Sequence, residues 1–114
     1  MKRIIAIIRP NMLDDLIYAL HTVENFPGAT MSEVRGMGRS FSRRVKESSQ
    51  TSSFGYPAQV RIEIICTEDK LEEILATIEN TVRTGRSGDG KIFISPIEEV
   101  IRVSSGQRGI DAII

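Results

Sequence analysis

Several features that are common in proteins are scarce in this sequence of 114 residues, and each absence excludes a class of protein. The formal charges cancel, with 15 basic and 15 acidic residues, so no bulk field would draw the chain to nucleic acid or to an anionic membrane. Cys66 is the only cysteine, which excludes an internal disulfide and fits a reducing compartment. We interpret Cys66 as an inert buried thiol because it ends an apolar run.

The sequence also lacks a long hydrophobic run at its start. Lys2 and Arg3 precede only the apolar residues 4–8, and Arg9 and Pro10 follow. Such a run is too short for a signal-peptide core or a membrane-spanning helix. We therefore expect a cytoplasmic protein that does not insert into a membrane.

Residue types for metal binding and catalysis are equally scarce. His21 is the only histidine, and because no Cys, His or carboxylate cluster accompanies it, we interpret it as a surface or half-packed side chain. Glu98 and Glu99 are adjacent and lack the flanking geometry of acid–base catalysis, and no nucleophile motif occurs. The sequence predicts no metal site, no catalytic residue and no tightly bound cofactor, so we expect a protein that is not an enzyme.

Hydrophobic periodicity indicates an α+β domain. The β-branched run 4–8 is typical of a strand buried on both faces, and the alternation over 58–64 predicts a half-buried strand. Asn11 can cap a helix whose apolar positions continue to Val23, with acidic residues in its first turn. The remaining candidates are a second amphipathic helix over 67–82, a weaker strand over 29–39, and apolar runs at 91–95 and 100–103.

The order strand, helix, strand, strand, helix, strand predicts a ferredoxin-like βαββαβ fold, with two helices on one face of an antiparallel sheet. The length suits a single domain over residues 1–114. The strands supply more aliphatic surface than one helix layer covers, so we expect burial between subunits. The aliphatic residues in question are Ile5, Ile7, Val60, Ile62 and Ile64.

A long polar segment, residues 40–57, separates the second predicted strand from the third. It has no sustained apolar period, and loops of this length in a small domain are usually functional or disordered. Two interpretations stay open: a mobile, solvated insertion, or a locally basic arm that orders on contact with an acidic partner. The candidate partner-binding residues are Phe41, Arg43, Arg44, Lys46, Phe54 and Tyr56.

A glycine-rich stretch over 84–93 is the strongest chemical signal. Three glycines in six residues, at 85, 88 and 90, let the backbone approach a ligand and direct N–H groups at an anion. Arg86 and Lys91 add positive charge, and Lys91 can act as a point charge on a phosphate. The stretch is not a Walker loop, because the glycine spacing differs and a strand follows it instead of a helix.

Separated segments, in matching order, resemble the PII signal-transduction proteins. The stretch 84–103 looks like their C-terminal signature, 1–10 like their first strand, and 30–39 like the strand that enters their long T-loop; 60–65 and 107–113 are similar to further parts of the family pattern. The resemblance implies a homotrimer with an adenine nucleotide (ADP, ATP or AMP) in each cleft between subunits. It also implies signalling through the T-loop to a protein partner, either a membrane transporter or a metabolic enzyme.

The family's nucleotide contacts fall on two sets of residues in this chain. The resemblance implies that adenine and ribose contact Ile7, Thr30, Met37, Gly38 and Ile65. It implies that phosphates contact Arg39, Gly88, Asp89, Gly90, Lys91 and Arg102. For Arg102 an alternative is that the side chain merely lies along the sheet edge.

Departures from the family pattern are informative too. Ser104 stands in place of a second phosphate-binding arginine, which should weaken ATP more than ADP or AMP. Ser40 and Gln59 replace a glutamine and a lysine that serve magnesium and 2-oxoglutarate, and Tyr56 does not match the family's tyrosine modification motif. We therefore expect a divergent member without 2-oxoglutarate sensing. The alternatives are a ferredoxin-like enzyme subunit that slowly hydrolyses nucleotide, or a ligand-independent adaptor.

Overall fold

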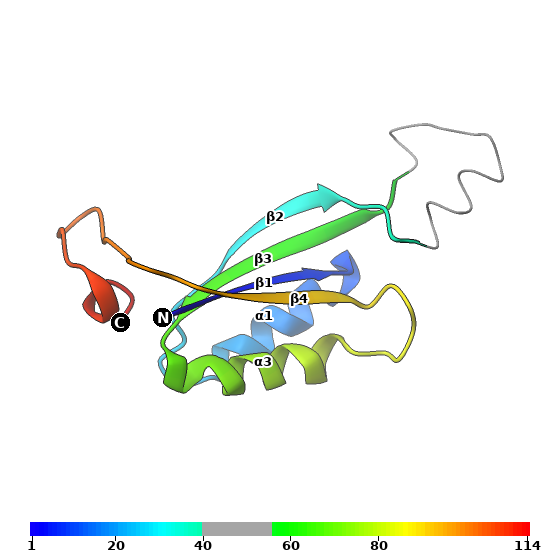
Figure 1. Ribbon diagram of the computed structural model, residues 1–114. Helices are drawn as coiled ribbons and strands as arrows, with labels where there is room; N and C mark the ends of the chain where they lie inside the picture. Colours follow the sequence, from blue (N-terminus) through cyan, green and yellow to red (C-terminus); the bar gives the residue numbers. More distant parts are fainter. Residues whose placement is uncertain (40–55) are drawn as a thin grey trace.

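The strands form one antiparallel sheet with both helices on the same face (Figure 1). The computed structural model describes residues 1–39 and 56–114. The sheet order is β2-β3-β1-β4, and each neighbouring pair is antiparallel. The elements in chain order are β1 (Lys2–Ile8), α1 (Leu13–His21), β2 (Thr30–Arg35), β3 (Ala58–Cys66), α3 (Glu68–Val82) and β4 (Gly90–Pro96). The ferredoxin-like βαββαβ prediction is confirmed.

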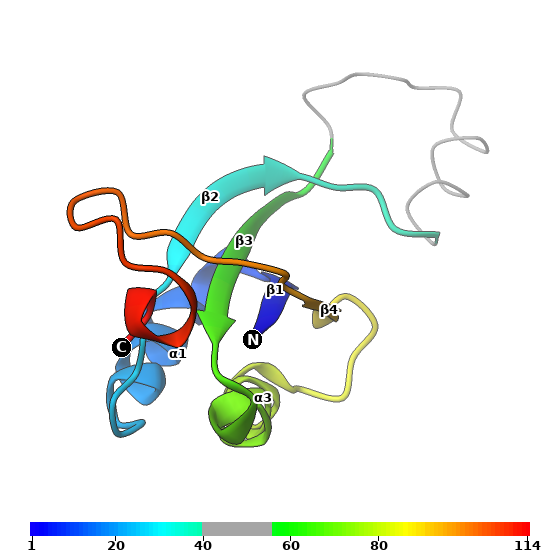
Figure 2. The ribbon, with the colours of Figure 1, turned by 60° about the vertical axis from the view of Figure 1, so that its left-hand side comes forward.

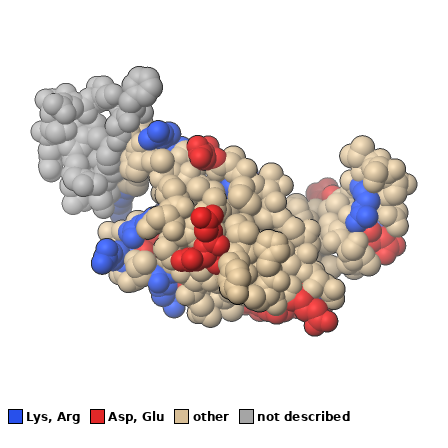
Figure 3. Space-filling model, turned by 180° about the vertical axis from the view of Figure 1, so that it is seen from behind, with Lys and Arg blue, Asp and Glu red and all other residues tan. Residues whose placement is uncertain are grey.

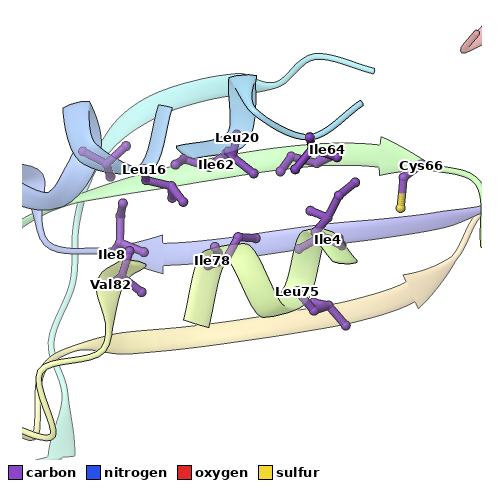
Figure 4. Close-up of a cluster of buried hydrophobic side chains, with 14 residues drawn as sticks. Ile4, Ile8, Leu16, Leu20, Ile62, Ile64, Cys66, Leu75, Ile78 and Val82 are labelled. Carbon is purple, nitrogen blue, oxygen red and sulfur yellow. The ribbon is translucent and has the colours of Figure 1, made fainter. Parts of the chain in front are cut away.

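The core lies between the helices and the inner face of the two central strands (Figure 4). Alternate residues of β1 and β3 point inward, and each aliphatic side chain buried there contributes about 1.5–3 kcal/mol. The largest fully buried side chains are Ile4, Ile8, Leu16, Leu20, Ile62, Ile64, Cys66, Ile74 and Ile78. Cys66 is buried, which confirms the prediction of a buried thiol, and burial raises the pKa of this thiol.

Two expectations about burial are wrong for the single chain. β1 is not buried on both faces: Ile5 and Ile7 are only half-buried, because the helices cover one side of the sheet. Val60, Ile62 and Ile64 do not belong to the uncovered surface, because they point toward the helices and are almost fully buried.

The start of the first helix also differs from the prediction. Asn11 does not cap it, because Pro10–Met12 form a 3-10 turn (η1) and α1 begins at Leu13 without a side-chain cap. The expected acidic residues, Asp14 and Asp15, do occupy the first turn. Val23 follows the end of α1 and is still buried in the core.

The C-terminal residues lie beyond one end of the sheet (Figures 1 and 2). The apolar run 100–103 is not a strand; Ile101 makes one isolated bridge to Arg108, and Val103 is 97% exposed. A 3-10 helix, η3 (Gly109–Ala112), follows. Among the residues that the structure describes, no helix is long and apolar enough to cross a membrane.

Candidate functional site

The loop between α3 and β4 is organised around the carboxylate of Asp89. This carboxylate accepts hydrogen bonds from the backbone N–H groups of Thr84 (2.7 Å) and Gly85 (2.9 Å), and from the Thr84 hydroxyl. The hydrogen bond from the Thr84 side chain, followed by those from the backbone, lowers the pKa of Asp89. The loop is therefore closed by a carboxylate that stays ionised at neutral pH.

Arg9, the residue after β1, holds the other side of the same loop. Its Nε donates to the carbonyl of Gly88 (3.0 Å) and one Nη to the carbonyl of Ser87 (3.1 Å). The second Nη lies 3.7 Å from a carboxylate oxygen of Asp89. In the sequence Arg9 marks only the end of a strand, and no pattern there predicts this contact.

Gly90 brings the end of the loop into contact with β1. Its φ is +112°, and a Cβ at this position would lie 1.8 Å from the carbonyl oxygen of Ile7. Only glycine fits such a close approach at a positive φ. Lys91 follows directly and is paired across the sheet with Ile7, so the glycine loop and Ile7 lie together, as expected of one site.

The long segment 40–57, called the arm from here on, leaves the sheet after β2 and returns to it at β3. Its base lies at this same end of the sheet (Figure 1). Beyond β2, the N–H of Gly36 donates to the carbonyl of Pro57 (3.2 Å), and Arg35 donates to the carbonyl of Tyr56 (2.8 Å). The Gln59 carboxamide fills the space beside Gly36, where a Cβ would lie 2.1 Å from its Oε1.

The predicted contacts Met37, Gly38 and Arg39 follow this base and are exposed. Of the predicted partner-binding residues, Tyr56 is half-buried at the base. The others lie outside the described residues, as does Ser40: they are Phe41, Arg43, Arg44, Lys46 and Phe54.

The remaining predicted residues lie at the opposite end of the sheet, around a hollow of about 420 Å³ that Thr30, Ile65 and Arg102 line together with Glu63. The Arg102 guanidinium donates to the carbonyl of Ala112 (3.2 and 3.3 Å) and to the Ile114 oxygen (2.9 Å). Arg102 therefore binds the C-terminal turn, and both its predicted phosphate contact and the alternative of a side chain lying along the sheet edge stay predictions.

One chain thus separates the predicted nucleotide residues into two groups. Lys91 is paired with Ile7, and Ile65 is paired with Arg3. Arg3 and Ile7 are four positions apart on β1, and this separation corresponds to about 13 Å. The half-buried Ile5 and the exposed Phe93 lie between the groups on the uncovered face. The structure unites Ile7 with the glycine loop, and Thr30 with Ile65 and Arg102, but does not join the two groups.

Basic side chains gather at the end of the molecule that carries the arm base and the glycine loop (Figure 3). Arg83, Arg86 and Lys91 all lie in or beside this loop, and Arg83 is paired with Glu79 at 2.9 Å. Across residues 1–39 and 56–114, no group of three or more His, Cys, Asp or Glu side chains could hold a metal ion. The chemistry of this end suits an anion.

Fold and site together define a class: a ferredoxin-like α+β domain whose glycine loop and long arm arise at the same end of the sheet. Comparison with known proteins gives the family. The family model "Nitrogen regulatory protein P-II" matches residues 1–107, so the chain belongs to the P-II family of regulatory proteins. The resemblance seen in the sequence is confirmed.

Individual relatives agree with this assignment over their full length. The chain is 40% identical to the nitrogen regulatory protein P-II of Bradyrhizobium diazoefficiens, 38% to that of Azospirillum brasilense and 36% to that of Nostoc punctiforme. Each alignment spans 113 residues, which is 99% of this chain and 100% of the relative. The chain is therefore similar to these regulators from end to end.

Proposed function

We propose that this P-II family member is a non-catalytic regulator that acts in the cytoplasm as a homotrimer. It binds ADP, ATP or AMP in the clefts between subunits and signals to a protein partner through residues 40–57. A membrane transporter is one class of partner that this proposal includes. Membership of a regulatory family supports the signalling role.

The separation of the two residue groups is the observation that supports a nucleotide site between subunits. A nucleotide that contacts both Lys91 and Arg102 can do so if the two residues come from different copies of the chain. The uncovered sheet face favours such an assembly, because it presents Ile5, Ile7 and Phe93 in a row next to both groups. Apolar surface of this kind is usually buried between subunits.

The charged side chains and backbone N–H groups of the proposed site are suited to binding phosphate. Lys91 supplies an ammonium group, and the glycine loop supplies backbone N–H donors. Arg102 now donates to neutral carbonyls, and an anionic phosphate oxygen is a stronger acceptor that competes with them. Since Ser104 provides no second guanidinium, we propose that a third phosphate adds less affinity here than it would beside two arginines.

We propose that nucleotide binding changes the arrangement of the arm through the residues at the base of the arm. Met37, Gly38 and Arg39 connect the hydrogen-bonded Gly36 to the arm, so a nucleotide in contact with them favours one arm arrangement over another. A signal requires different nucleotide affinities for the two arrangements, since equal affinities shift no equilibrium. The basic residues of the arm would then meet an acidic surface on the partner.

Calorimetry on Lys91→Ala and Arg102→Ala tests this function. Loss of either cation from a phosphate contact should cost about 1.5–3 kcal/mol of binding free energy, roughly a ten- to hundredfold loss of ADP affinity. Lys70→Ala is the control, because Lys70 is paired with Glu73 on α3 (3.5 Å) and should bind ADP as the parent does. Unaltered binding in both site variants would contradict the proposed site, and phosphate release that Lys91→Ala abolishes would favour the enzyme hypothesis.

The same site should not sense 2-oxoglutarate. The Gln59 carboxamide is neutral and packs against Gly36, so a dicarboxylate there would lose hydration without gaining a cation. We expect no saturable binding when 2-oxoglutarate is titrated into protein loaded with ATP and magnesium. Micromolar binding would show that Ser40 and Gln59 have been misinterpreted.

A further inference from the structure

Arg9 holds two consecutive carbonyl groups of the glycine loop. Its Nε bonds the carbonyl of Gly88 at 3.0 Å, and its Nη bonds that of Ser87 at 3.1 Å. The contact is close, since a Cβ at Gly88 would lie 3.1 Å from the same Nη atom. A guanidinium group has the rigid fork of donors that bonds two acceptors at once.

The planarity of the peptide bond gives this contact a further consequence. In a trans peptide, the carbonyl and the N–H that follows it point in opposite directions. The carbonyls of Ser87 and Gly88 point at Arg9, so the N–H groups of Gly88 and Asp89 point away from it. The Asp89 N–H donates a long hydrogen bond, 3.3 Å, to the Arg86 carbonyl. Two successive N–H groups on one side of a loop form a concave site for an anion.

We propose that Arg9 is a positioning residue: it holds the carbonyl side of the glycine loop so that the N–H groups of Gly88 and Asp89 face the phosphate of the bound nucleotide. This inference rests on the proposed nucleotide site. It assigns to Arg9 a role in which the guanidinium binds the protein backbone and does not touch the ligand.

The backbone of Arg9 is fixed well enough to serve as this anchor. Arg9 directly follows β1, whose last residue, Ile8, is paired with Val60 of β3 and with Gly90 of β4. Its carbonyl accepts a hydrogen bond from the Met12 N–H (3.1 Å), and its φ and ψ of −69° and 139° are the extended values favoured before proline. Asp89 lies 3.7 Å from the guanidinium and helps to orient it. A rigid anchor lowers the entropic cost of ordering the loop on binding.

Calorimetry with two ligands on Arg9→Lys tests the proposal. Lysine keeps the positive charge but lacks the fork, so ADP affinity should fall roughly tenfold with the lost hydrogen bonds. The affinity for adenosine, which has no phosphate, should stay unchanged. Arg83→Lys is the matched control, because the Arg83 guanidinium is paired with Glu79 of α3 at 2.9 Å; this variant should bind both ligands as the parent does.

A second measurement uses the parent protein and does not depend on how the variant folds. In ¹H–¹⁵N spectra, ADP should shift the amide signals of Gly88 and Asp89, while the Arg9 Nε–H keeps the position of a group bonded to a carbonyl. A large shift of Arg9 Nε–H on adding ADP would make Arg9 a direct ligand and overturn the proposal. Equal losses for ADP and adenosine in Arg9→Lys, or no loss, would overturn it as well. Failure of the parent protein to bind any adenine nucleotide would instead overturn the proposed function, and this inference with it.

Discussion

Asp89, Arg9 and Arg102 hold their segments of the chain through hydrogen bonds to the backbone. Asp89 accepts hydrogen bonds from the N–H groups of Thr84 and Gly85, Arg9 donates to the carbonyls of Ser87 and Gly88, and Arg102 donates to the C-terminal turn. Bonds between a charged group and the backbone are stronger than neutral ones. They shape two short segments that have almost no apolar core of their own.

The lowered pKa of Asp89 leads to a prediction about single residues. Because its pKa lies below the ordinary value of 3.8, the ionised carboxylate stabilises the loop above that value, and the contribution is lost as the pH falls through the lower native pKa. Thr84→Val should raise the pKa toward its ordinary value, since the Thr84 hydroxyl is the largest cause of the shift. The amide shift of Gly85, followed by NMR against pH, reports the midpoint. Thr81→Val, which removes only a hydroxyl bonded to Thr77 on α3, is the control; equal midpoints in the two variants would contradict the assignment.

Residue type alone could predict only part of this chemistry. Lys91 and the glycines stand out in the sequence because their density is unusual within a few positions. Arg9 does not, because its acceptors are carbonyls 78 and 79 residues away, and every residue has a carbonyl. Such a contact depends on the fold bringing the end of β1 beside the glycine loop.

At the scale of elements, strands with one covered face were the easiest to predict. The alternation over 59–64 matches the burial of β3 residue by residue, whereas Ala58, at the start of the strand, is exposed. The start of α1 was harder, because Pro10 and Asn11 are both favourable near a helix start, and here proline begins a 3-10 turn that takes up the position. The run 100–103 looked like a strand because periodicity cannot tell a paired strand from an exposed turn with one bridge.

The junction of the glycine loop with β4 gives a prediction about stability. Gly90→Ala would place a Cβ on the Ile7 carbonyl at a positive φ, and should lower the free energy of unfolding by about 2–4 kcal/mol. Gly38→Ala should change it by less than about 0.5 kcal/mol, since nothing lies within 4 Å of a Cβ there. Urea denaturation of both variants measures the difference. Similar values for the two would show that β1 and the loop separate easily.

At the scale of the whole molecule, the sheet has one covered and one uncovered face. The sequence indicated an excess of aliphatic residues but not which side they occupy, because register and helix placement decide that together. Val60, Ile62 and Ile64 were assigned to the wrong side, while Phe93 was not considered. The uncovered face is more mixed than expected, with Arg61 and Glu63 paired on it at 2.8 Å.

Neighbouring residues on β4 test the assembly. Phe93 and Ile94 are 54% and 49% exposed, but Phe93 is paired with Ile5 on the uncovered face and Ile94 with the buried Ile4 on the other. Phe93→Asp should lower the mass in light scattering from three subunits to one, because a carboxylate would be buried between subunits. Ile94→Asp should leave the mass unchanged. A parent protein that is monomeric at micromolar concentration would refute the trimer directly.

The arm base has a consequence for how such regulators diversify. The hydrogen bond from Gly36 to Pro57 fixes both ends of the arm against the sheet, so the fold requires only that the chain between them closes a loop. The entropy of closure changes by about 0.6 kcal/mol for each doubling of loop length. Under the proposed function, evolution can therefore exchange one recognition sequence for another at this point at little cost to folding, while the sheet, the glycine loop and the core stay as they are.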